Sequence, residues 1–194
     1  MGAIEHNQRH ADLVADLSRK ILQTLGYPTR EAELAAIAGF LHDLGNMANR
    51  YGHGLTGAIF AYNLLREMGM PPEELAVVMS AIGNHEEKAG GHPVTPVGAA
   101  VILADKSDVH HTRVRKTDLA QFTRRDRVNY AARQSLLDVN PEQRVITMKL
   151  IIDPQICSVM EYFEIFLAKM IMCRRAAAAL QCQFELIIND AKLL

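Results

Sequence analysis

Four histidines and two aspartates stand out, because each lies on an apolar helical face or at the end of one. They are His10, His42, Asp43, His53, His85 and Asp105. Each histidine alone is consistent with a hydrogen-bonded core residue or, for His53, with a surface loop residue. Together, buried in one small bundle, they would be costly unless a cation satisfied them. The sequence therefore predicts a metal site.

The donor atoms indicate which metals would bind. Imidazole nitrogen and carboxylate oxygen without thiolate suit divalent Fe, Mn, Zn, Co or Ni. The three cysteines, Cys157, Cys173 and Cys182, form no C-x-x-C pair and are expected to be reduced, structural thiols. The adjacent His42 and Asp43 leave a helix about 100° apart, so both reach one ion only near the helix terminus. We expect one or two ions, a number that spacing alone leaves open.

Five helices are predicted to position these residues, because apolar residues recur every three or four positions between glycine and proline breaks. The first, second and fourth cover residues 7–25, 29–45 and 71–83. The third follows residues 51–57 and ends at 69, and the fifth begins at 93–96 and ends at 108. His10 lies on the apolar face of the first helix, and His42 and Asp43 lie in the last turn of the second. His53 precedes the third helix.

The pattern changes after residue 118. Residues 144–152 and 184–190 are rich in β-branched and apolar residues, which is typical of buried strands, and a helix is predicted between them over 155–180. The predicted fold is mainly α: a helical bundle over residues 1–118, with a small strand-helix-strand appendage over 119–194 packed on it. Exposed strand edges pair readily, so the appendage is also expected to support a homodimer.

The order H, HD, H, H, D resembles that of the HD-domain superfamily of metal-dependent phosphohydrolases, over roughly residues 7–116. The segments AAIAGFLHDLGN, GHGLTGAIFAYNLL, MSAIGNHEE and GAAVILADKSD are similar to the corresponding segments of that superfamily. The resemblance implies an HD-domain bundle in which His10, His42, Asp43 and Asp105 bind one ion. It also implies that Asp43 bridges to a second ion held by His53 and His85.

A more distant similarity connects NHEEKAGGHP to the HD-GYP cyclic-dinucleotide phosphodiesterases. Asn84 stands where that group has a ligand histidine, and His92 replaces its tyrosine. Asn46, in the sequence Leu-Gly-Asn after the HD doublet, replaces a lysine. A third metal ion and specificity for cyclic di-GMP are therefore not expected.

Metal-ion chemistry then gives a mechanism. A water on one ion, or between two ions roughly 3.5–4 Å apart, loses a proton and attacks the phosphorus, while the ions offset the phosphoryl charge. Asp43, His42, Lys106 and Asp108 are the predicted catalytic residues, with Asp108 orienting a ligand or a water. A salt bridge on the helix is the alternative for Lys106 and Asp108.

Basic residues after Asp105 form a candidate substrate site. The predicted substrate-binding residues are His111, Arg113 and Arg115, within a basic stretch that also contains His110, Lys116, Arg124, Arg125 and Arg127. Each of these residues singly is consistent with a solvated surface. The predicted substrate is a phosphomonoester or phosphodiester of a small, nucleotide-like molecule.

Two other classes remain open. Some HD proteins with four histidine and two aspartate ligands are di-iron oxygenases, and the ligand list does not separate them from hydrolases. A non-catalytic metal-binding sensor or interaction module is the third reading. A net charge of -1, a charged N-terminal segment and no long uncharged stretch predict a cytoplasmic protein that binds neither membranes nor nucleic acid duplexes.

Overall fold

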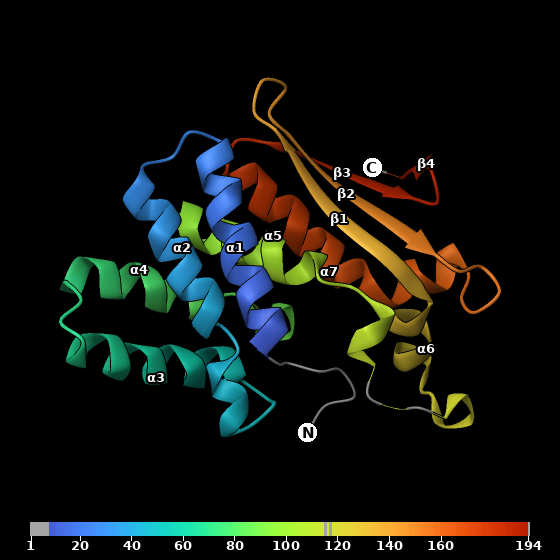
Figure 1. Cartoon of the computed structure of the whole chain (residues 1–194), viewed down its shortest axis with the longest axis horizontal. Coiled ribbons are helices and arrows are strands. Elements are labelled where there is room, and N and C mark those ends of the chain that lie inside the picture. The colour runs from blue at the N-terminus through green and yellow to red at the C-terminus, as the bar shows by residue number, and fades with distance from the viewer. Residues whose placement is uncertain (1–7, 115, 117, 194) are drawn as a thin grey trace.

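Five helices form the first part of the chain in the computed structural model, which describes residues 8–114, 116 and 118–193 (Figure 1). They are α1 (Gln8–Thr24), α2 (Thr29–Leu41), α3 (His53–Glu67), α4 (Pro72–Gly83) and α5 (Pro96–Ser107). All five predicted helices are present, with ends that differ by a few residues. Asn7, the predicted start of the first helix, lies outside the described residues. Within the described part of the chain, no helix is long and apolar enough to cross a membrane.

Helix α5 is the central helix of the fold. Its run Val97–Ala104 contains no polar side chain, and every residue in it is buried. A helix that is apolar on all sides must be covered on all sides. Helices α1, α2 and α4 pack against α5, and α7 (Val159–Ala179) packs against it from the C-terminal part of the chain. Asp105 and Lys106 therefore extend from the last turn of a helix that its neighbours hold in place.

Helix α2 ends earlier than predicted. Its last residue is Leu41, His42 is its C-cap, and Asp43 precedes the short 3-10 helix η1 (Leu44–Met47). The prediction placed both residues inside the last helical turn, with the helix continuing to Gly45. The early end turns the chain toward α3, whose first residue is His53.

A four-stranded mixed sheet and two helices make up the C-terminal part. After the short 3-10 helices η2 (Glu87–Ala89), η3 (His111–Arg113) and η4 (Leu119–Gln121) come α6 (Arg124–Ala131), β1 (Ala132–Asn140) and β2 (Val145–Ile152). Strand β2 pairs antiparallel with β1 and parallel with β3 (Gln183–Ile188), which pairs antiparallel with β4 (Ala191–Lys192). Helix α7 is the crossover between the parallel strands β2 and β3, and it packs on both.

The prediction of strand, helix and strand identified β2, α7 and β3 but missed α6, β1 and β4. Strand β1 is at an edge, and Ala132 is its only fully buried residue, so its sequence lacks the apolar run of β2. Helix α6 is short and mostly polar. Its available signal was a capping box, in which the Thr123 side chain accepts from the Asp126 backbone and the Asp126 side chain accepts from the Thr123 backbone.

Candidate metal centre

The six predicted ligands come from five different places in the fold and meet beside the ends of α2 and α5. His10 is on α1, His53 begins α3, and His85 follows α4. All four imidazoles are buried, whereas the Asp43 and Asp105 side chains keep 15% and 13% of their surface exposed. The carboxylates thus face an opening, and the histidines lie behind them.

One group of donors surrounds His42. Its Nε2 atom lies 3.4 Å from Asp43 Oδ2 and 3.7 Å from Asp105 Oδ1. The Nε2 atom of His10 lies 3.6 Å from the same Asp43 oxygen and 3.4 Å from the same Asp105 oxygen. Two imidazole nitrogens and two carboxylate oxygens therefore enclose one small space.

A second group uses the other oxygen of Asp43. Asp43 Oδ1 lies 3.2 Å from His53 Nε2 and 4.0 Å from His85 Nε2. These two nitrogens are only 3.1 Å apart. One carboxylate thus presents one oxygen to each pair of histidines, which is the arrangement that a bridging ligand requires.

The donor spacing fits a metal ion. Bonds of about 2.0–2.2 Å at roughly tetrahedral or octahedral angles place neighbouring ligand atoms about 3.0–3.5 Å apart. Most distances within the two groups fall in or near this range. Candidate ligand atoms of His10, His42 and Asp105, and again of His42, Asp43 and His85, all lie within 4.8 Å of one another.

The outer nitrogens fix the direction of the rings. His42, His53 and His85 each place Nδ1 within 2.6–3.1 Å of the backbone carbonyl oxygen three residues earlier. A carbonyl only accepts, so Nδ1 carries the proton and the Nε2 lone pair of the neutral ring points into the cluster. His10 Nδ1 instead lies 2.7 Å from Asp108 Oδ2.

This orientation makes a cation necessary. His53 and His85 bring two Nε2 lone pairs to 3.1 Å, which is repulsive unless a proton or a metal ion lies between them. His42 Nε2 is buried and has no hydrogen-bond partner among the described residues. The residues present therefore fit a metal centre.

The electrostatics of the cluster also favour a cation. Burial lowers the pKa of His42, but Asp43 and Asp105 outweigh it and raise that pKa to about 10. Burial, together with the positive charges of His42 and Lys106, lowers the pKa of His85 to about 3. Without metal, the two carboxylates thus retain a proton on His42 while His85 stays neutral.

Lys106 and Asp108 make defined contacts next to the ligands. The Lys106 ammonium donates to Asp105 Oδ2 at 2.7 Å and lies 2.9 Å from Glu87 Oε2. Burial opposes the charge of Glu87, but Lys106 lowers its pKa to about 2. Asp108 contacts Arg9 and Arg113 as well as His10, so it holds the His10 ring in place.

A close backbone approach positions the HD doublet against α3. A Cβ atom added at Gly45 would lie 2.0 Å from the backbone oxygen of His53 and 2.6 Å from the backbone nitrogen of Gly57. Only glycine fits at this point. Gly45 thereby brings His42 and Asp43 within reach of His53.

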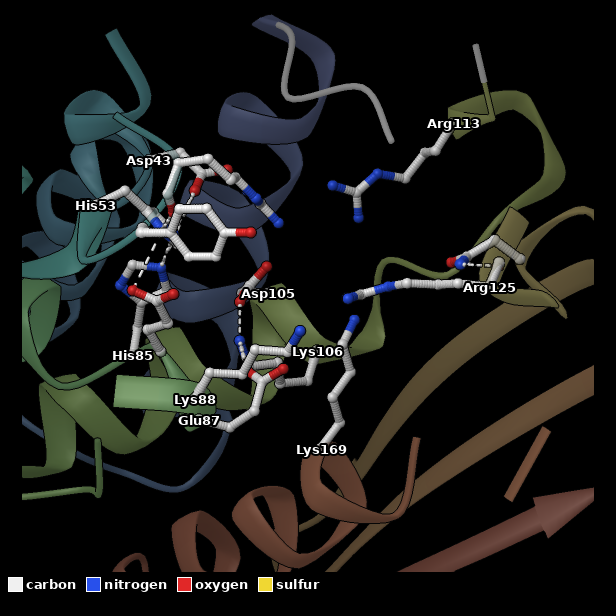
Figure 2. A pocket seen from close by; sticks show the side chains of 14 residues that line it. Asp43, His53, His85, Glu87, Lys88, Asp105, Lys106, Arg113, Arg125 and Lys169 are labelled. Atoms are coloured by element: carbon white, nitrogen blue, oxygen red, sulfur yellow. Dashed lines mark hydrogen bonds and ion pairs between the residues drawn. The ribbon is translucent and has the colours of Figure 1, made fainter. Parts of the chain in front are cut away.

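A cavity of about 230 Å³ opens beside the cluster. Figure 2 shows His53, His85 and Asp43 on one side of it, with Arg113, Arg125 and Lys169 reaching toward the space from the other. Six cationic and four acidic side chains line it: Arg50, Lys88, Lys106, Arg113, Arg125, Lys169, Asp43, Glu86, Glu87 and Asp105. The arrangement can hold an anion in contact with a metal centre.

The predicted substrate residues are placed unequally. Arg113 lines the cavity, whereas His111 does not and packs against Tyr130. Arg115 lies outside the described residues. Sequence analysis did not single out Glu87 or Lys169. The available signal for Lys169 was its spacing, because it follows Tyr162 and Phe166 by seven and three residues and so places a cation on the inner side of α7.

The comparisons with known proteins agree with the geometry. A search of curated proteins found no match to the chain. The family model described as HD domain matches residues 8–113, which is more than half of the chain and includes all six ligand candidates. An HD-GYP subfamily match is not shown. The chain belongs to the HD-domain family.

Proposed function

We propose that the protein is a metal-dependent phosphohydrolase that acts on a phosphomonoester or phosphodiester of a small, nucleotide-like molecule. The observation that carries the proposal is the pairing of a six-residue His/Asp cluster with a cation-lined cavity. Typical members of the HD-domain family are metal-dependent phosphohydrolases. A phosphate bound there would contact positive charge on both sides.

His10, His42, Asp43 and Asp105 would hold one ion, and His53 and His85 would hold a second one shared through Asp43. When bound, such ions polarise a phosphoryl oxygen and lower the pKa of a coordinated water to near 7. Asp108 fixes the ring of His10, and Asp43 fixes the distance between the two histidine groups. Lys106 and Arg113 offset negative charge in the cavity.

Replacing Asp43 with alanine tests this assignment. We expect Asp43→Ala to remove phosphate release from a panel of phosphate esters and nucleotides, supplied with Mn, Co, Ni, Fe or Zn in turn. Circular dichroism should remain helical, because Asp43 lies outside the helices. Asp16→Ala, on an exposed position of α1, is the matched control and should keep full activity. Full activity in Asp43→Ala would refute the assignment.

The same samples separate the other two functions. An oxygenase would contain iron, consume oxygen in the presence of substrate and release no phosphate. A binding module would retain metal and turn over no substrate. The cationic cavity wall favours phosphate chemistry over both.

A further inference from the structure

The cations of the cavity differ in how their charge is compensated. Lys106 is paired with Asp105 and Glu87. Arg113 donates to the backbone oxygen of Asp108 at 2.5 Å and lies 3.4 Å from its carboxylate. These two charges are largely balanced by the protein itself.

Arg125 and Lys169 are not balanced in this way. Arg125 Nε is buried and has no hydrogen-bond partner within the described part of the chain. Lys169 makes no ion pair within 4.0 Å among the described residues, so the nearby Asp105 and Glu87 compensate its charge only in part, and its ammonium lies 4.7 Å from the centre of the Phe166 ring. Burial and the charge of Lys106 lower the pKa of Lys169 to about 8.

The two side chains approach the cavity from different elements. Arg125 extends from α6 and Lys169 from α7, and Figure 2 shows both reaching toward Lys106 and Asp105. A cation that is only partly compensated in a partly buried site is costly, and two such cations close together add mutual repulsion. An anionic group between them would remove both costs.

A phosphate at the His/Asp cluster would meet Lys106 and Arg113, whose charges already have partners. Arg125 and Lys169 add two further cationic side chains to the same cavity. Both residues also lie beyond residues 8–113, the part that matches the HD-domain model. The C-terminal part therefore adds to the cavity a feature of its own.

We propose that Arg125 and Lys169 form a second anion site. The substrate then carries a second phosphate or carboxylate group in addition to the phosphate at the His/Asp cluster. This inference rests on the proposed function for the identity of the first group. The C-terminal part then selects substrates that carry two separate anionic groups, while the helical bundle supplies the metal ligands.

Binding of unreactive ligands tests the site without turnover. The probes are alkane diphosphonates with two to six methylene groups between the phosphonates, each compared with the alkyl monophosphonate of equal length. Isothermal titration is performed with the full chain loaded with Mn. We expect at least one diphosphonate to bind roughly tenfold more tightly than its monophosphonate, since hydrogen bonds to charged groups are strong.

Single substitutions then locate the site. Lys169→Met and Arg125→Gln should each remove most of the preference for the diphosphonate and change monophosphonate affinity by less than about twofold. Lys169→Arg should keep the preference. Lys20→Met and Arg175→Gln, at exposed helical positions outside the cavity, are the matched controls. Melting curves and metal content identify any variant that fails to fold, and the other variant then carries the test.

The outcomes are separable from those of the proposed function. Equal affinity for both phosphonate types, or a preference unchanged in both variants, would overturn the second anion site even if phosphate esters are hydrolysed. A preference that depends on Arg125 and Lys169 supports the site. It would do so even if no phosphate ester were hydrolysed, a result that would refute the proposed function alone.

Discussion

Gly45 connects the HD doublet to α3, and replacing it with alanine should disrupt folding and metal binding together. The added Cβ would lie 2.0 Å from the His53 backbone oxygen, whereas ordinary contacts begin at 3.4 Å. The two backbones would have to separate by more than about 1 Å. Overpacking of this kind typically costs 1–3 kcal/mol, and the obstacle here is backbone on both sides. We expect Gly45→Ala to lower the free energy of unfolding by about 3 kcal/mol, roughly 100-fold in the folding equilibrium.

The same shift should weaken the metal site. Metal–ligand distances tolerate only about 0.2 Å of change. A displacement of His53 relative to Asp43 should therefore reduce metal affinity at least about tenfold. Urea unfolding followed by circular dichroism gives the first quantity, and elemental analysis after dialysis against a weak chelator gives the second.

Gly98→Ala is the matched control, because a Cβ at that helical position would meet its nearest atoms at 3.5 Å, an ordinary contact. It should keep both the stability and the metal content of the wild type. Gly45→Ala behaving like Gly98→Ala in both assays would refute the argument that this close approach builds the site.

Three further results are expected. Lys106→Met should cost about 3–5 kcal/mol in the metal-free protein at pH 7, because Glu87 loses its ion-pair partner and Asp105 loses one of its positively charged neighbours. Lys106 lowers the pKa of Glu87 in the folded protein from 4.5 to about 2, so the stabilisation by this ion pair is present above pH 4.5 and is lost toward pH 2. In urea unfolding, the difference in stability between the wild type and Lys106→Met should therefore shrink between pH 4.5 and pH 2. A metal ion must displace the proton of His42, whose pKa is raised to about 10. The apparent metal affinity should therefore increase about tenfold for each pH unit between pH 6 and 8, measured by competition with a chelator. Tyr162→Phe should raise the free energy of unfolding by about 1 kcal/mol in thermal or urea unfolding, because the Tyr162 hydroxyl is buried without a hydrogen-bond partner among the described residues.

The elements with a strong apolar pattern were predictable from the sequence. The five helices of the first part, strand β2 and helix α7 bury continuous or periodic apolar residues, and such patterns depend only on local spacing. Strand β1 and helix α6 were missed, because an edge strand and a short polar helix are stabilised by their neighbours.

The identity of the ligand candidates also came from the sequence. Residue types and order sufficed to name His10, the His42–Asp43 doublet, His53, His85 and Asp105, since buried polar residues on apolar faces are rare. Their convergence in space could not be read from spacing, because it depends on how five separate elements pack. The family resemblance implied that Asp43 is shared between two histidine groups, and the structure adds which of its oxygens faces each group.

The sequence by itself determined the helical class and named the candidate donor set, whereas the class of metal stays a prediction. The tertiary structure determined which side chains face the His/Asp cluster across the cavity. Lys169 is 64 residues beyond Asp105 in the chain and on another helix, and no local pattern connects them. They are neighbours because α7 packs on α5 through the apolar sides of both helices. The spacing of residues within either helix does not predict that these two charges meet.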